Sequence, residues 1–168
     1  MPALIVLLVL SLPEPSGATA CRPEAAAARA VRAVAEGIVA ADNARDVERV
    51  VAHYAADAVL LPPGESPVHG RAAIRPRYEA LFAAFAPAIV GRVDEVCAEG
   101  RLALVRGHNG GRLAARGGEP SRDLDDAYLM VLRREDDGHW RISHLIWHRA
   151  SPPPSARVPG AGEKGAAR

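Results

Sequence analysis

The period of the hydrophobic pattern changes at Pro87, and this change constrains the fold more than any other feature. Before Pro87, apolar residues recur at three- and four-residue steps in three runs, which predicts amphipathic helices. After it, four runs up to residue 150 alternate in polarity or are rich in β-branched residues, with glycine-rich turns between them. Helices followed by a strand meander predict an α+β domain in which helices cover one face of an antiparallel sheet. The helical runs are 24–41, 43–54 and 74–85, and "AVLL" at 58–61 predicts one early strand.

Turn-forming residues mark the expected helix boundaries. The stretch "DNARD" at 42–46 separates the first two helices, with Asn43 expected as the N-cap of the second and Asp46 in its first turn. Pro76 lies inside the third helical run. It is tolerated in the first turn of a helix and otherwise kinks it.

Both ends of the chain differ from this body. The apolar run "LIVLLVLSL" is too short to span a bilayer and is typical of the core of a signal peptide, although no Lys or Arg precedes it. We therefore predict a signal peptide over 1–20 and export from the cytoplasm. The segment 151–168 is rich in Pro, Gly and small residues, which predicts a disordered tail and leaves 21–150 as the folded domain.

Two cysteines leave an alternative open. Cys21 directly follows the small residues of the expected cleavage site, as the acylated cysteine of a lipoprotein does, but Ala18 stands where a lipobox usually has Leu. The protein is then either freely exported or anchored through Cys21, and membrane contact is expected only in the second case. A lipidated Cys21 would leave Cys97 without a partner, so a structural disulfide is not expected.

Charge excludes one class of partner. The chain has 21 basic and 20 acidic residues and a net charge of +1. Nucleic-acid binding needs a concentrated basic surface, so we exclude it. There is no phosphate-binding glycine loop and no G-x-S-x-G motif, and we predict no cofactor.

The stretch "DGHWRISHLIWH" at 137–148 raises the question of a metal site. His144 and His148 are four residues apart, which on a helix would bring both imidazoles to one metal. The stretch follows a D-G turn and alternates in polarity, which predicts a strand. On a strand these residues lie roughly 13 Å apart, too far to share a zinc ion with bonds of about 2 Å. We therefore predict no metal site.

Acidic residues precede the third of the four strand runs. Asp123, Asp125 and Asp126 form either a solvated strand entrance or a functional group. In the second case one of them faces an apolar cavity, has a raised pKa and acts as an acid or base.

The stretches "YAADAVLLPPGESPVHGRAAI" (54–74) and "GHWRISHLIWH" (138–148) resemble the ketosteroid-isomerase-like and SnoaL-like members of the nuclear-transport-factor-2-like superfamily. The resemblance implies a cone-shaped, curved antiparallel sheet wrapped around three N-terminal helices. It also implies an apolar interior that binds a small hydrophobic molecule, and a homodimer formed through the outer sheet face.

The resemblance extends to only part of the ketosteroid isomerase site. That enzyme uses an Asp base, with a Tyr and a protonated Asp as oxyanion hole. The matching positions here are Ile38, Pro62 and Met130, so its chemistry is absent. Two supporting tyrosines match Tyr54 and Tyr78, and a pocket tryptophan matches Trp147.

The resemblance also assigns faces to the last strands. Trp147 faces inward together with Leu145 and Ser143, while His144 and His148 face outward. On the neighbouring strand Asp126, Tyr128, Met130 and Leu132 face inward. The predicted acid or base is Asp126, with Tyr128 or His108 as its partner. The predicted cavity lining is Tyr54, Tyr78, Met130, Leu145 and Trp147.

Two functions remain from the sequence. The first is an exported, cofactor-free protein that binds a small hydrophobic molecule and catalyses its isomerisation, dehydration or cyclisation. The second is a non-catalytic binding or dimerisation module, for which we expect a filled cone with no cavity above about 300 Å³.

Overall fold

The computed structural model describes residues 21, 24–118 and 120–149. The predicted signal peptide and tail lie outside the described residues. Helices and strands follow in the expected order, which confirms the α+β prediction. The helices are α1 (Ala25–Ala44), α2 (Val47–Ala52) and α3 (Arg71–Ala84). The strands are β1 (Tyr54–Leu61), β2 (Val68–His69), β3 (Phe85–Glu99), β4 (Leu102–Ala115), β5 (Arg122–Arg134) and β6 (Trp140–Arg149).

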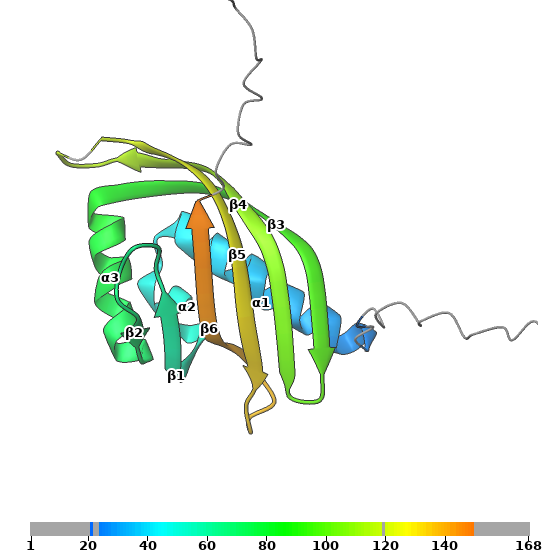
Figure 1. Ribbon diagram of the computed structural model, residues 1–168. Helices are drawn as coiled ribbons and strands as arrows, with labels where there is room; N and C mark the ends of the chain where they lie inside the picture. Colours follow the sequence, from blue (N-terminus) through cyan, green and yellow to red (C-terminus); the bar gives the residue numbers. More distant parts are fainter. Residues whose placement is uncertain (1–20, 22–23, 119, 150–168) are drawn as a thin grey trace, which may run out of the picture.

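The strands form one curved, open sheet in the order β2-β1-β6-β5-β4-β3 (Figure 1). Long antiparallel ladders join β3 to β6 in sequence order. The expectation of a wholly antiparallel sheet is wrong at one pair, because β1 runs parallel to β6. These two strands are separated by α3 and the whole meander, so no tight turn forces them to be antiparallel.

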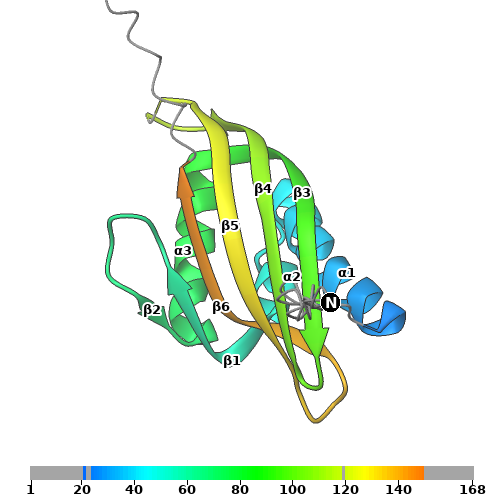
Figure 2. The same ribbon diagram turned by 45° about the vertical axis from the view of Figure 1, so that its right-hand side comes forward.

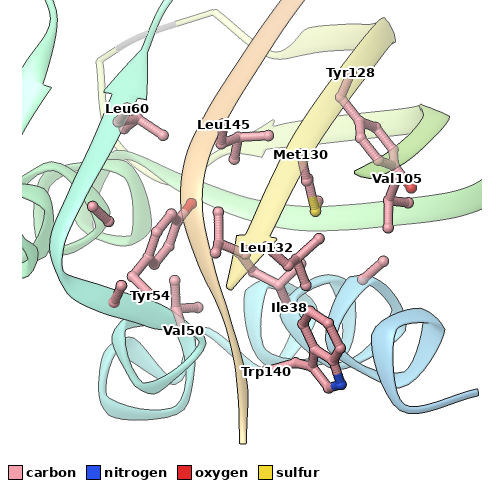
Figure 3. Close-up of a cluster of buried hydrophobic side chains, with 14 of the residues drawn as sticks. Ile38, Val50, Tyr54, Leu60, Val105, Tyr128, Met130, Leu132, Trp140 and Leu145 are labelled. Atoms are coloured by element: carbon pink, nitrogen blue, oxygen red, sulfur yellow. The ribbon is translucent and has the colours of Figure 1, made fainter. Parts of the chain in front are cut away.

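Helix α1 lies across the concave side of the sheet (Figures 1 and 2). Its buried residues recur at three- and four-residue steps and join one core cluster with residues of β4, β5 and β6 (Figure 3). Burial of this stripe is what holds a lone helix to the sheet. The buried residues of α1 are Val31, Ala35, Ile38 and Ala41. None of the helices in the described part is long and apolar enough to cross a membrane.

The joint between α1 and α2 differs from the expectation. Helix α1 continues to Ala44 and ends because Arg45 adopts the left-handed conformation, with φ of 55°. Asp46, not Asn43, is the N-cap of α2, since its carboxylate accepts a hydrogen bond of 3.0 Å from the Arg49 amide. Asn43 instead pairs its side-chain amide with the backbone of Ile89 on β3, through bonds of 2.8 and 2.7 Å. This pairing fixes the end of α1 on the sheet.

Helix α3 begins at Arg71, so Pro76 is its sixth residue and lies beyond the first turn. Proline has no amide hydrogen, so α3 lacks one backbone hydrogen bond at this point. Pro76 contributes to the cavity wall described below.

A β-bulge in β6 changes which side chains share a face. The pairing with β5 skips Ser143, since Val131 pairs with His144 and Leu132 pairs with Ile142. Trp140 and Ile142 therefore lie buried on the same side as Leu145. Strict alternation from Trp147 along β6 would put Trp140 and Ile142 on the outward face, and the bulge is the reason that it does not hold there. Beyond the bulge, His144 and His148 are exposed, as expected.

Cys21 and Cys97 form a disulfide, with their Cα atoms 5.4 Å apart. The expectation that no structural disulfide forms is therefore wrong. That expectation depends on a lipidated Cys21 and does not consider the path of β3, which packs against α1 and ends near the start of that helix (Figure 2). A lipid thioether at Cys21 would need the same sulfur atom, so the disulfide and the lipid are alternative states of this residue.

The disulfide closes a loop with a sequence separation of 76 residues. We expect Cys97→Ser to lower the free energy of unfolding by up to about 4 kcal/mol, because the unfolded chain gains the entropy of an open loop. Thermal unfolding followed by circular dichroism should show a lower Tm for the variant. A reductant should lower the Tm of the wild type and leave Cys97→Ser unchanged. Two free thiols in the non-reduced protein would contradict the prediction.

Candidate functional site

A cavity of about 660 Å³ opens between the C-terminal half of α1, helix α3 and the concave face of the sheet. Its volume lies within the range of small-molecule sites. Most of its wall is apolar, and the loop after β1 contributes Pro63 and Glu65 at one side. This cavity is more than twice the limit of about 300 Å³ that we set for a filled cone.

The strand register arranges the sheet wall in rows. Met130 pairs with Leu145, and in the next inward-facing row Tyr128 pairs with Trp147. The row beyond is polar, because Asn109 pairs with Asp126 and Asp126 pairs with Arg149. A ligand in the cavity therefore meets an apolar surface on two rows and polar groups on the third. Figure 3 shows Met130 and Leu145 on neighbouring strands within the buried cluster.

Asp42 is a candidate functional residue that the sequence analysis does not identify. It lies in the last turn of α1 and lines the cavity. Burial raises the pKa of its carboxyl from 3.8 to about 7, and its Oδ1 atom is shielded from solvent and has no hydrogen-bond partner. One sequence signal points to it, because Asp42 stands four residues after Ile38 and so falls on the buried face of the helix. The stretch "DNARD" by composition alone indicates only a helix break.

The two tyrosines expected in the cavity form a pair. The Tyr54 and Tyr78 hydroxyls are 2.7 Å apart. Tyr78 belongs to the cavity wall, whereas Tyr54 is fully buried behind it. Burial raises the pKa of both phenols, and the negative charge of Asp42 raises both further, so each stays a neutral donor. If Tyr54 donates to Tyr78, the hydrogen of Tyr78 is left for a group in the cavity.

The structure brings two of the three predicted catalytic residues to the cavity. Asp126 and Tyr128 lie on its wall, two residues apart on β5. Partial burial raises the pKa of Asp126, while the positive charge of Arg149 acts in the opposite direction. The Tyr128 hydroxyl donates a long hydrogen bond of 3.4 Å to the Arg92 carbonyl. The catalytic roles of Asp126 and Tyr128 stay predictions.

His108 is not brought to the cavity. Its neighbours along β4, Gly107 and Asn109, face the concave side, which places the His108 ring on the outer face. There its Nδ1 atom lies 2.8 Å from the Asp94 carboxylate. The geometry therefore does not support His108 as a partner of Asp126.

The other residues expected to line the cavity, Met130, Leu145 and Trp147, are all at its wall. Among the residues that the structure describes, no group of three or more His, Cys, Asp or Glu side chains could hold a metal ion.

An open α+β cone with an apolar cavity and a buried carboxyl is the class of protein that this fold and site define. The sequence model of the SnoaL-like domain matches residues 31–143. The chain therefore belongs to the SnoaL-like domain family. No curated protein sequence matches it.

Solved structures share this fold at low sequence identity. A ketosteroid isomerase-like protein from Erwinia carotovora atroseptica superposes with a TM-score of 0.68 and 23% identity, covering 74% of this chain and 97% of its own. A candidate dehydratase of the nuclear-transport-factor-2-like family from Streptomyces avermitilis has a TM-score of 0.63 and 19% identity, covering 76% and 98%. A candidate scytalone dehydratase from Novosphingobium aromaticivorans has a TM-score of 0.63 and 16% identity, covering 73% and 83%. At these identities the likeness establishes the fold alone.

The raised pKa of Asp42 predicts a pH dependence of stability. The unfolded chain releases this proton near pH 4, whereas the folded chain holds it until about pH 7. Stability therefore falls as pH rises between these values, because the unfolded state binds fewer protons there. Relative to Asp42→Asn, which does not titrate, the wild type should lose no more than about 4 kcal/mol. Urea unfolding at several pH values measures the difference. Parallel curves for the two proteins would contradict the prediction.

Proposed function

We propose that this protein is a cofactor-free enzyme that transfers protons on a small apolar molecule, with Asp42 as its acid and base. The observation that carries the proposal is a cavity-lining carboxyl whose pKa is raised to about 7 by burial. Such a group holds and releases a proton at neutral pH, which is what general acid–base catalysis requires.

The proposed reaction begins when ionised Asp42 removes a proton from a carbon next to a carbonyl group. The electron pair moves toward the oxygen, which accepts a hydrogen bond from the neutral Tyr78 hydroxyl. Return of the proton to another carbon completes an isomerisation. Where the carbon β to the carbonyl carries a hydroxyl group, the electron pair instead forms a C=C bond as the C–O bond breaks, and transfer of the proton to the departing hydroxyl releases water and completes a dehydration. Neither outcome needs an oxidant or a reductant.

The family and fold support this proposal at a coarse level. SnoaL-like membership and structural neighbours described as ketosteroid isomerase-like and as candidate dehydratases agree with a small-molecule-binding or catalytic fold. The apolar rows of the sheet wall favour a hydrophobic substrate. Asp126, the acid or base predicted from the sequence, remains a second candidate on the same wall. A non-catalytic binding protein, the other function left by the sequence, would use the same cavity without proton transfer.

We further propose that the protein is exported. A Cys21–Cys97 disulfide supports this, because disulfides persist in oxidising compartments and are rare in the cytosol. Attachment to a membrane would require the reduced, lipidated form of Cys21.

We also propose a homodimer through the outer sheet face. Exposed apolar side chains support this, among them Ile146 at 46% and Leu102 at 59% exposure, with His144 and His148 beside Ile146 on β6.

Exchange of carbon-bound hydrogen tests the proposed chemistry without knowledge of the natural substrate. We expect the protein to accelerate deuterium uptake from heavy water into bicyclic ketones, followed by NMR. The rate should rise with pH through about 7, because the base must be ionised. Asp42→Asn should lower the rate by about 10²- to 10⁴-fold, the usual contribution of a general base.

Two matched variants complete the experiment. Asp125→Asn removes an exposed acid beside Asp126 on the same strand and should leave the rate unchanged. Asp126→Asn tests the second candidate. Full activity in Asp42→Asn, together with loss in Asp126→Asn, would move the role to Asp126. Exchange no faster than in buffer for every ketone would contradict the proposed function.

A further inference from the structure

Two polar side chains of the cavity have no hydrogen-bond partner in the described part of the chain. Asp42 lines the cavity from α1, and Asn109 lines it from β4. The Oδ1 atom of each is shielded from solvent and makes no hydrogen bond. A buried acceptor without a donor costs about 1–3 kcal/mol. Each of the two oxygens therefore lacks a hydrogen-bond donor.

Both side chains can present an oxygen to the cavity by rotation about one bond. Rotation about Cβ–Cγ exchanges the two oxygens of Asp42, and it exchanges the oxygen and nitrogen of Asn109. Asn109 lies opposite Gly91 on one neighbouring strand and Asp126 on the other, so no bulky side chain covers it from β3. The two groups line the same cavity, one from its helical wall and the other from its sheet wall.

The charges at the cavity are balanced. Three acids and three arginines line it, and one pair, Glu65 and Arg77, forms a salt bridge of 2.8 Å. Arg149 lies beside Asp126 across the β5–β6 ladder. Near pH 7, where Asp42 is partly protonated, these charges still come close to cancelling, so the lining does not strongly favour a ligand of either sign. Recognition by hydrogen-bond donors on a neutral molecule fits this lining better.

We infer that the ligand of this cavity is a neutral ring compound that carries two hydrogen-bond donors, as a diol or an amino alcohol does. Its ring packs against the rows formed by Tyr128 with Trp147 and Met130 with Leu145. Its donors reach Asp42 and Asn109. The inference rests on the proposed function only in requiring that the cavity bind a ligand, and it holds whether or not proton transfer follows.

Quenching of Trp147 fluorescence measures binding directly. The chain has two tryptophans, so Trp140→Phe leaves Trp147 as the reporter at the cavity wall. The probes are indane, indan-1-ol, the indane-1,2- and 1,3-diols, and the dimethyl ethers of these diols. We expect at least one diol to bind about tenfold or more tightly than its ether, because the ether leaves both protein oxygens without a donor.

Substitutions then assign the preference to the two residues. Asn109→Leu and Asp42→Leu should each reduce the preference for the diol about fivefold or more, whereas Asn109→Asp should keep it. Asp42→Asn retains an acceptor oxygen, so it should keep the diol preference while losing proton transfer. Circular dichroism and Tm confirm that each variant is folded. Where a leucine variant does not fold, Asn109→Ala and Asp42→Ala carry the same expectation.

Each other outcome is decisive. Equal binding of diols, ethers and indane would overturn the inference and leave the proposed function standing. A preference that survives in the leucine or alanine variants would overturn it as well. Diol-selective binding without deuterium exchange would support the inference and contradict the proposed enzyme. No binding of any probe would overturn the inference, and the proposed function would then be decided by the exchange experiment alone.

Discussion

The site depends on where α1 ends above the concave face of the sheet. The buried stripe of α1 covers part of that face, and the left-handed conformation of Arg45 stops the helix at Ala44. Beyond that point α3 forms the opposite wall, and the space between the two helices is the cavity. Only the last two turns of α1 reach it, through Ile38 and Asp42. One backbone conformation thus sets both the length of the helix and the position of its carboxyl.

Asp42 lowers the stability of the fold at its position in α1, and we attribute its presence there to the chemistry proposed for its carboxyl. The pattern of the helix favours an apolar residue there, and a carboxyl at this position loses hydration without gaining a partner. The side chain cannot leave easily, because the next residue, Asn43, is held to the Ile89 backbone by two hydrogen bonds. Functional groups are expected at positions where a residue departs from the apolar pattern of its helix and the neighbouring residues hold it in place.

Sequence reasoning succeeded where geometry is repetitive. Alternation along β5 places Asp126, Tyr128 and Met130 on one face, and a regular antiparallel strand allows no other arrangement. It failed where one residue interrupts the repeat. The bulge at Ser143 moves Trp140 and Ile142 to the inner face, and alternation alone contains no sign of an extra residue.

The two acids of the cavity show a further limit of sequence reasoning. Asp126 could be found because it precedes a strand of clear polarity, but the pKa of Asp42 depends on what surrounds it in space. Burial alone acts on the carboxyl of Asp42, whereas Arg149 opposes burial at Asp126. The two environments therefore separate the pKa values, with that of Asp42 the higher. A carboxyl with a pKa of about 7 can both take up and release a proton at neutral pH, which is why the proposed acid–base role falls on Asp42 and not on Asp126.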